Sequence, residues 1–215
     1  MIVIVPCCGE SQRYNGTKKQ FLKLPNGLPL PIFSQSGLTN VEKVVYTFLE
    51  ADFLHYYENN SLWHGDICLL QKPTASQVDT VVQTIKKLSL RNDAIYVKDC
   101  DNYFQAIASC NTVTIKSIYN STFKLHNKSY TVFNDKGRIT QIAEREDISK
   151  YINVGGYGFA NGALFLKHSS GNTHISDVIN QAIKAGSRFS VNYCEKYIDY
   201  GEQDDYDKFI KSMQA

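Results

Sequence analysis

The chain has 215 residues, 43% of them hydrophobic and 12% aromatic, which is enough to build a sizeable core as one domain over residues 1–215. Its net charge of +2 is spread along the chain, which argues against a dedicated nucleic-acid-binding protein with a basic stripe. Only about five apolar residues open the chain, so we expect neither a signal peptide nor a membrane span, and a cytoplasmic location.

The first half of the chain alternates between two patterns. Buried strands are predicted by four short β-branched apolar runs, at residues 1–5, 66–72, 94–99 and 111–117. Apolar residues with helical spacing lie between them, at residues 40–58 and 79–90. This β-α-β-α-β order predicts a sheet with parallel strands joined by right-handed crossovers.

The second half predicts an antiparallel addition to that sheet. Runs at 128–133 and 137–144 read as strands, with a turn at 134–137 between them. A glycine-rich segment at 153–167 is also strand-like.

Two helices are predicted after this region. The first covers residues 174–186, with Ser176 or Asp177 as its N-cap and Gly186 at its end. The second is amphipathic, covers residues 204–213, and has four residues expected to face inward: Tyr206, Phe209, Ile210 and Met213.

Cysteine and histidine spacing does not indicate a metal site or a disulfide framework. The six cysteines contain no CxxC pair, so we expect reduced residues that serve packing. The five histidines also lack ligand spacing and are assigned to the surface or the core: His55, His64, His126, His168 and His174.

The loop after the first strand could bind an anion. Small residues around Gly9 would let backbone N–H groups approach a phosphate, and Arg13 and Lys19 would neutralise its charge. A tight turn with two solvated cations fits the same residues. Both interpretations stay open on this segment alone.

Aspartates supply the second candidate site. Asp99 and Asp101 end a buried strand at i and i+2, where their carboxylates point the same way and suit Mg²⁺. Asp199 could complete that site, or it could form a turn with Gly201 while the next aspartates cap the last helix. Lys72 ends another strand and could either meet a substrate or remain solvated.

The order of these features resembles the sugar-phosphate nucleotidyltransferases, that is, the nucleoside-diphosphate-sugar pyrophosphorylases and the related cytidylyltransferases. The opening G-x-G-[ST]-R loop and downstream lysine of that family are similar to PCCGESQRY and KKQFLKL, with Gly9, Arg13 and Lys19 in register. Cys8 takes the place of a small residue. Ser11 replaces the second glycine, and Gln12 replaces the Ser or Thr.

Later motifs extend the resemblance to nearly the whole chain. TASQVDTV resembles the base-recognition segment and KDCDNYF the metal-binding strand. NDKGRITQIAER, NVGGYGF and YIDYGEQDDY resemble, in turn, the stretch ending in a Glu-Lys pair, the strand lining the sugar pocket and the element with the second metal ligand. Arg145 replaces the lysine of that pair. The resemblance thus implies these further site residues: Ser76, Gln77, Thr80, Asp99, Asp101, Glu144, Arg145, Asn153, Gly155, Tyr157 and Asp199.

The resemblance implies a Rossmann-like, three-layer α/β fold of the GT-A type with a mixed, mostly parallel central sheet. It also implies Mg²⁺-dependent transfer of a nucleoside monophosphate from a nucleoside triphosphate to a sugar phosphate or similar phosphomonoester, with release of pyrophosphate. Arg13 and Lys19 would be catalytic, and Lys72 and Arg145 would be cations for the substrate phosphate. Neither a nucleic acid nor a membrane is an expected partner, and homodimers are common among such folds.

Two other functions remain open. Asp99-Cys100-Asp101 also spells the D-x-D motif of glycosyltransferases that use a finished nucleotide-sugar. The replacements at Ser11, Gln12 and Arg145 would also suit a homologue that binds nucleotide with weakened catalysis.

Overall fold

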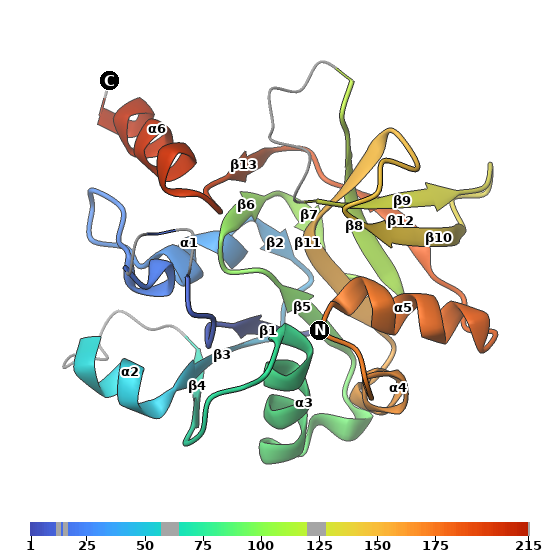
Figure 1. The fold of residues 1–215 in the computed structure, drawn as a ribbon, viewed down its shortest axis with the longest axis horizontal. Helices are drawn as coiled ribbons and strands as arrows, with labels where there is room; N and C mark the ends of the chain where they lie inside the picture. Colours follow the sequence, from blue (N-terminus) through green and yellow to red (C-terminus); the bar gives the residue numbers. More distant parts are fainter. Residues whose placement is uncertain (12–13, 15–16, 57–64, 120–127, 215) are drawn as a thin grey trace.

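The computed structural model describes residues 1–11, 14, 17–56, 65–119 and 128–214 (Figure 1). Its strands are β1 (Ile2–Pro6), β2 (Leu38–Thr39), β3 (Lys43–Leu49), β4 (Asp66–Leu70), β5 (Ile95–Lys98), β6 (Asn102–Phe104), β7 (Ala106–Ile107), β8 (Thr112–Ser117), β9 (Ser129–Phe133), β10 (Ile139–Glu144), β11 (Tyr151–Phe159), β12 (Ser190–Tyr193) and β13 (Tyr197–Asp199). Its helices are α1 (Leu30–Gln35), α2 (Glu50–Tyr56), α3 (Gln77–Lys87), α4 (Gly162–His168), α5 (Ile175–Lys184) and α6 (Gln203–Gln214), with 3₁₀ turns η2 (Lys19–Phe21) and η4 (Leu90–Asn92).

The central sheet is mixed, as expected. Its main path runs β10-β9-β11-β5-β1-β3-β4. The four strands β5, β1, β3 and β4 are parallel, whereas β11 runs antiparallel to β5 and begins the antiparallel part. β8 pairs with β11, and β12 pairs with β8.

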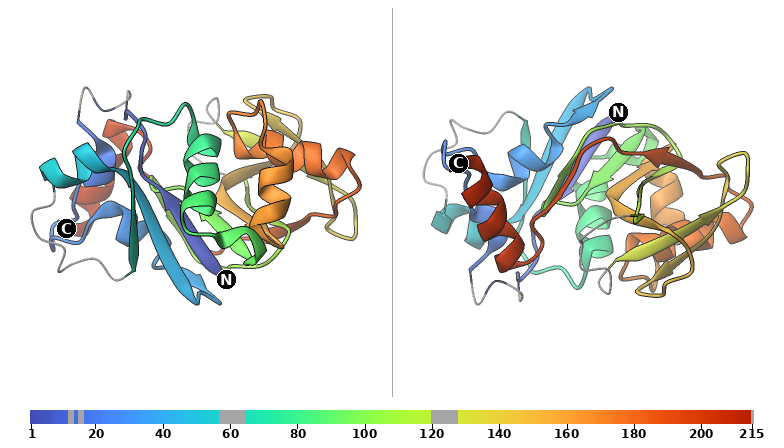
Figure 2. Two further views of the ribbon diagram at one scale, coloured as in Figure 1. Left: turned by 90° about the horizontal axis from the view of Figure 1, so that it is seen from below. Right: turned by 90° about the horizontal axis from the view of Figure 1, so that it is seen from above.

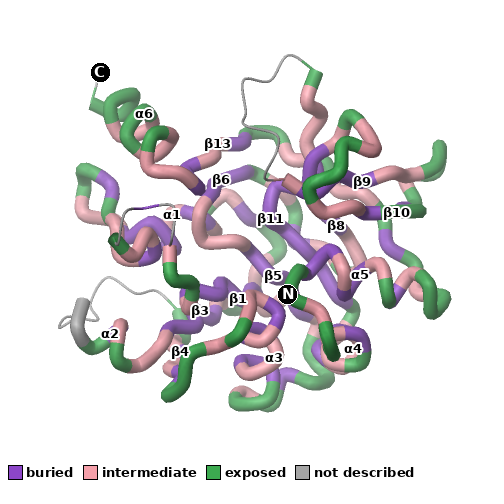
Figure 3. The backbone as a smooth tube through the Cα atoms, viewed as in Figure 1, coloured by how far each residue is buried: buried purple, intermediate pink, exposed green. Residues whose placement is uncertain are grey.

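Helices cover both faces of this sheet, which gives three layers (Figure 2). Ile4 of β1 packs in a core cluster with side chains of α3, α4 and α5. Its neighbours Val3 and Val5 face the opposite cluster, which includes Ile32 of α1. Because successive residues of a strand point to opposite faces, β1 is buried on both sides. Buried residues gather along the strands at the centre of the molecule in Figure 3.

Residues 43–49 form a strand and not part of a helix, so the helix expected over 40–58 is wrong in its first half. β3 lies between β1 and β4, and α2 begins only at Glu50. Residues 45–48 are all buried, because both faces of β3 are covered. A continuous apolar run of this kind has no alternation to distinguish a strand from a buried helix.

The glycine-rich segment is a strand only as far as Phe159. Asn161 then caps α4, accepting a hydrogen bond from the Leu164 N–H at 2.8 Å. The turn at 134–137 is confirmed, with Gly137 at φ +71°. Asn134 and Gly137 close that turn with a backbone bond of 2.8 Å.

Both C-terminal helices differ in detail from expectation. α5 begins after His174, and Ser176 lies inside it with its hydroxyl on Glu144 at 2.8 Å, so neither Ser176 nor Asp177 is the N-cap. Gly186 does end the helix, with φ +93°. In α6, Tyr206, Phe209 and Ile210 pack against a third cluster as expected, but Met213 is 45% exposed.

All six cysteines are free thiols. Within the described ranges, no helix combines the length and apolar character needed to cross a membrane.

Candidate active site

Two cavities open beside the carboxyl ends of β1 and β5. The larger has a volume of about 610 Å³ and the smaller about 120 Å³. Gln77, Asp99 and Asp101 line both, so these three side chains form a shared wall between them. The carboxyl edge of parallel strands is where open α/β sheets bind their ligands.

The loop after β1 forms one side of the larger cavity. Ser11 has φ +52°, a left-handed conformation that glycine adopts at less cost. Its hydroxyl donates to Gln20 Oε1 at 2.8 Å and accepts from the Lys19 N–H at 3.0 Å. Gln20 in turn donates to the Gly9 carbonyl at 2.9 Å. Ser11 is therefore tied to η2. Arg13 and Gln12 lie outside the described residues.

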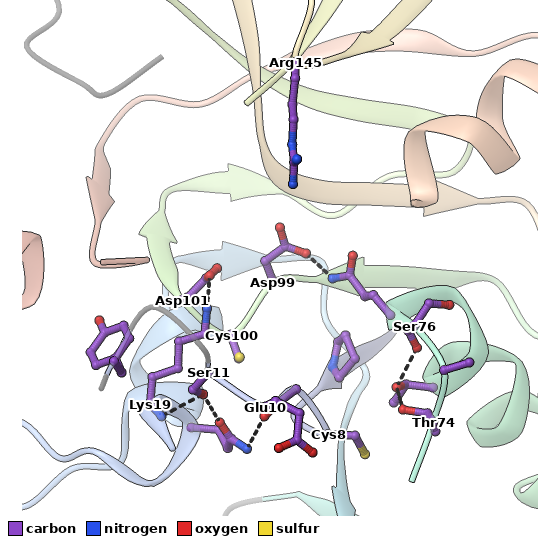
Figure 4. Close-up of a pocket in the computed structure, with 17 residues that line it drawn as sticks. Cys8, Glu10, Ser11, Lys19, Thr74, Ser76, Asp99, Cys100, Asp101 and Arg145 are labelled. Carbon is purple, nitrogen blue, oxygen red and sulfur yellow. Dashed lines mark hydrogen bonds and ion pairs between the residues drawn. The ribbon is translucent and has the colours of Figure 1, made fainter. Parts of the chain in front are cut away.

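Lys19 lies at the edge of the shared wall. Its ammonium pairs with Asp101 Oδ2 at 2.5 Å, and both side chains are largely buried (Figure 4). Tyr14 also lines the larger cavity, and its hydroxyl donates to the Tyr200 carbonyl. This bond ties the opening loop to the C-terminal segment.

Asp99 is held through both its side chain and its backbone. Gln77 donates to its Oδ1 at 2.5 Å, and the Asp99 N–H donates to the Gly155 carbonyl at 2.8 Å. Gly155 has φ +83°, and a Cβ there would stand 2.7 Å from the Asp99 Cγ. Burial, and then the nearby charge of Asp101, raise the pKa of Asp99.

A buried lysine holds the turn that carries both aspartates. Lys98 Nζ donates to the Asp99 carbonyl at 2.6 Å and to the carbonyl and side-chain oxygens of Asn102 at 2.9 and 2.7 Å. The ammonium also lies 4.5 Å from the centre of the Phe104 ring. Burial lowers the pKa of Lys98 to about 8.

The N-terminus of α3 closes the larger cavity on another side. Ser76 is the N-cap and accepts from the Asp79 N–H at 3.1 Å. Thr80 lines the cavity one turn later, with its hydroxyl 2.7 Å from that of Thr74. Cys8 also lines it, and burial raises the pKa of its thiol to about 12, so the thiol is neutral and a poor nucleophile.

The smaller cavity is lined mainly by polar groups, including Glu144, Asn153 and Tyr157. Glu144 accepts from Ser176, and His174 Nδ1 lies 3.8 Å from its other oxygen. Asn153 Oδ1 accepts from Thr131. Its Nδ2 is buried and has no hydrogen-bond partner in the part of the chain that the structure describes. Burial, and then the charge of Asp99, raise the pKa of Tyr157.

Asp199 lies beside the aspartate pair but is held by other groups. β13 pairs with β6, which places Asp199 opposite Asn102. Its Oδ2 forms an ion pair with Lys128, and its Oδ1 accepts from the Gly201 N–H at 3.1 Å, which is the turn that the sequence left open. Over the described ranges, no three His, Cys, Asp or Glu side chains form a ready-made metal-binding group.

The structure brings most of the predicted residues to one of the two cavities. Lys72 is exposed and lines neither. Arg145 lines the larger cavity, toward which its side chain extends in Figure 4, and not the smaller one. Lys98, Lys128 and His174 were missed from the sequence. Lys98 begins the motif KDCDNYF, but the resemblance implied a role only for its aspartates, and Lys128 and His174 have no motif around them.

No protein-family model matches the chain. Nor does any curated protein match it. Solved structures do match, over almost its full length.

An inositol-1-phosphate CTP transferase from T. maritima covers 99% of this chain and 94% of its own at a TM-score of 0.76, with 15% identity. A nucleoside-diphosphate-sugar pyrophosphorylase from Vibrio cholerae RC9 covers 98% and 100% at 0.71, with 18% identity. A CTP:phosphocholine cytidylyltransferase from Streptococcus pneumoniae covers 99% of both chains at 0.69, with 17% identity. The chain therefore has, from end to end, the α/β fold of these nucleotidyltransferases.

Proposed function

We propose that this protein transfers a nucleoside monophosphate from a nucleoside triphosphate to a phosphomonoester such as a sugar phosphate, releasing pyrophosphate. One observation carries the proposal: a larger cavity and a small polar cavity share a wall made of Asp99, Asp101 and Gln77. A nucleotide in the first and a phosphomonoester in the second would meet at that wall. The similar structures named above act on inositol-1-phosphate and phosphocholine, which are both phosphomonoesters.

The larger cavity suits a triphosphate. Lys19 supplies a cation beside Asp101, and the loop at Gly9 and the N-terminus of α3 offer backbone N–H groups to an anion. Arg13 would add a second cation to this loop by its place in the sequence. These groups would stabilise the pyrophosphate as it leaves.

The carboxylates suit Mg²⁺, which we include in the proposal. Mg²⁺ is commonly held by one or two carboxylates together with phosphate oxygens, and Asp99 and Asp101 offer oxygen donors at the shared wall. Burial and the charge of Asp101 raise the pKa of Asp99, which means that they disfavour its ionised form. A divalent cation would favour that ionised form. Asp199, on the strand β13 that pairs with β6, would be a further ligand while it keeps its ion pair with Lys128. The ion would supply positive charge for the phosphate oxygens.

In the reaction, an oxygen of the acceptor phosphate attacks the α-phosphorus, and the bond from that phosphorus to the β-phosphate oxygen breaks. The protein needs no covalent intermediate, so its task is to hold the two reactants in line and to offset their charge. Lys98 contributes by fixing the turn between Asp99 and Asn102. We extend the proposal to an enzyme of nucleotide-sugar and polysaccharide biosynthesis that works in the cytoplasm, as a homodimer.

The test measures pyrophosphate release with Mg²⁺, each of four nucleoside triphosphates and pooled phosphomonoesters. Asp101→Asn keeps the size of the side chain and removes its charge, so we expect kcat/KM to fall roughly a hundredfold or more. Asp135→Asn, at an exposed turn, is the matched control and should retain wild-type activity.

The same assay decides between the alternatives. Wild-type release no greater than that of Asp101→Asn, with every pairing, would refute the proposal and leave a nucleotide-binding homologue. Consumption of a nucleotide-sugar with release of nucleoside diphosphate would indicate the glycosyltransferase.

A further inference from the structure

The two cavities differ in the cations that line them. Among the described residues, the larger cavity is lined by one lysine and one arginine, Lys19 and Arg145. The smaller cavity is lined by one lysine, Lys128, and no arginine of the described ranges. The smaller cavity is also lined by three carboxylates, Glu144 and the two aspartates of the shared wall. A phosphomonoester carries close to two negative charges and would be repelled there without a cation.

Lys128 is held in place before any ligand binds. Its ammonium forms an ion pair with Asp199 and a hydrogen bond of 3.1 Å to the Tyr197 hydroxyl, and its side chain is 18% exposed. A lysine ammonium has three N–H donors, so these two contacts leave one for a ligand in the cavity that it lines. A side chain that is already ordered loses less entropy when the ligand arrives.

The ion pair with Asp199 places the Lys128 ammonium near the shared wall. Asp199 is fixed by the Gly201 N–H and lies opposite Asn102, which directly follows Asp101 in the chain. The Asn153 Nδ2, nine-tenths buried and without a partner in the described ranges, is a second donor at the same cavity. Two donors therefore face the space where the acceptor would lie.

We propose that Lys128 binds the phosphate of the acceptor. The sequence resemblance had implied this role for Arg145. This inference rests on the proposed function. Lys128 and Arg145 lie side by side, because the Arg145 N–H donates a backbone hydrogen bond of 3.0 Å to the Lys128 carbonyl. Their side chains nevertheless line different cavities, so Arg145 serves the nucleotide and Lys128 the acceptor.

The test compares Lys128→Met with Arg145→Met in the pyrophosphate assay, varying one substrate at a time. Because a charged hydrogen bond is lost, we expect Lys128→Met to raise the KM of the acceptor roughly tenfold or more. The KM of the nucleoside triphosphate should stay within about twofold. Arg145→Met should give the opposite pattern. Lys136→Met, at an exposed turn, is the charge-matched control and should change neither constant.

Lys128→Arg keeps the charge and should recover part of the acceptor affinity, which a merely structural role would not predict. Unchanged acceptor KM in Lys128→Met, or equal losses for both substrates, would overturn the inference while leaving the proposed function intact.

A second readout separates the two failures. Inorganic phosphate is titrated by calorimetry into wild type, Lys128→Met and Arg145→Met, all without nucleotide. If the wild type has no turnover with any pair, the proposed function fails. Phosphate binding that is lost in Lys128→Met and kept in Arg145→Met would still support Lys128 as the phosphate ligand. Phosphate binding that is equal in all three proteins would overturn it.

Discussion

The position of the Asp99 carboxylate requires a glycine at position 155, because any side chain there would occupy the same space. Gly155 has a left-handed backbone at φ +83°, and an added Cβ would collide with the carboxylate. Gly27 has the same φ but nothing within 4 Å of its Cβ position. Alanine substitutions at Gly155 and Gly27 therefore share the backbone strain, and only the one at Gly155 adds the collision with Asp99.

Gly155→Ala should lower the free energy of unfolding by about 1–3 kcal/mol and also reduce turnover, because Asp99 must move. Gly27→Ala should cost about 1–2 kcal/mol of backbone strain and keep turnover. Urea unfolding and the pyrophosphate assay measure the two effects. Equal turnover in both variants would show that the Asp99 position is not fixed by Gly155.

Lys98 makes stability depend on pH. Burial lowers its pKa from the usual 10.5 to about 8, so between these values the unfolded chain holds a proton that the folded chain has released. Stability must then rise with pH across this window, because unfolding takes up a proton. The penalty for burying the charge is fully present below pH 8 and is relieved as the pH approaches 10.5.

Lys98→Met removes this titration. We expect the stability of the wild type relative to Lys98→Met to rise with pH by up to about 3 kcal/mol in total, at 1.36 kcal/mol per pKa unit. Urea unfolding of both proteins at pH 7.5 and at pH 10 checks it. A difference that stays constant would show that Lys98 does not titrate in this window.

At the scale of elements, α3 joins stability to the site, because its N-cap Ser76 also lines the larger cavity. Ser76→Ala should lower the free energy of unfolding by about 1 kcal/mol, since the Asp79 N–H loses its acceptor, and Ser76→Gly by a few tenths. Thermal and urea unfolding measure the loss. Ser212→Ala, on exposed α6, should stay within about 0.5 kcal/mol. Equal effects at the two serines would contradict the cap.

The sequence predicted those elements whose patterns are unambiguous. Its signals are the helical spacing over residues 79–90 and the turn residues at 134–137, which act within a few residues, and the structure confirms the helix and the turn. It assigned β3 to a helix, because a strand buried on both faces has no alternation and its identity depends on strands β1 and β4 at its sides. Met213 was expected to face inward, but α6 extends past the cluster that covers its first turns.

At the scale of the molecule, the two cavities exist because distant segments meet at one edge of the sheet. The motif residues could be predicted because parallel strands place their carboxyl ends together, which brings Gly9 and Asp99 to one cavity. Lys128 and His174 could not, since the first is placed by the pairing of β9 with β10 and by its ion pair with Asp199 on β13, and the second by the packing of α5 on β10. Their positions depend on tertiary packing and carry no local signal.

The bond network of Ser11 limits which changes the opening loop can accept. A glycine has no side chain with which to bond its neighbours. The Ser11 hydroxyl, by contrast, donates a hydrogen bond to Gln20 and accepts one from the Lys19 N–H. Residues 11 and 20 should therefore be energetically coupled, and the effects of changing both should not add. The loop and the turn that presents Lys19 then form one unit, in which glycine at position 11 would remove the donor to Gln20 Oε1 and the acceptor of the Lys19 N–H, while Gln20 keeps its bond to the Gly9 carbonyl.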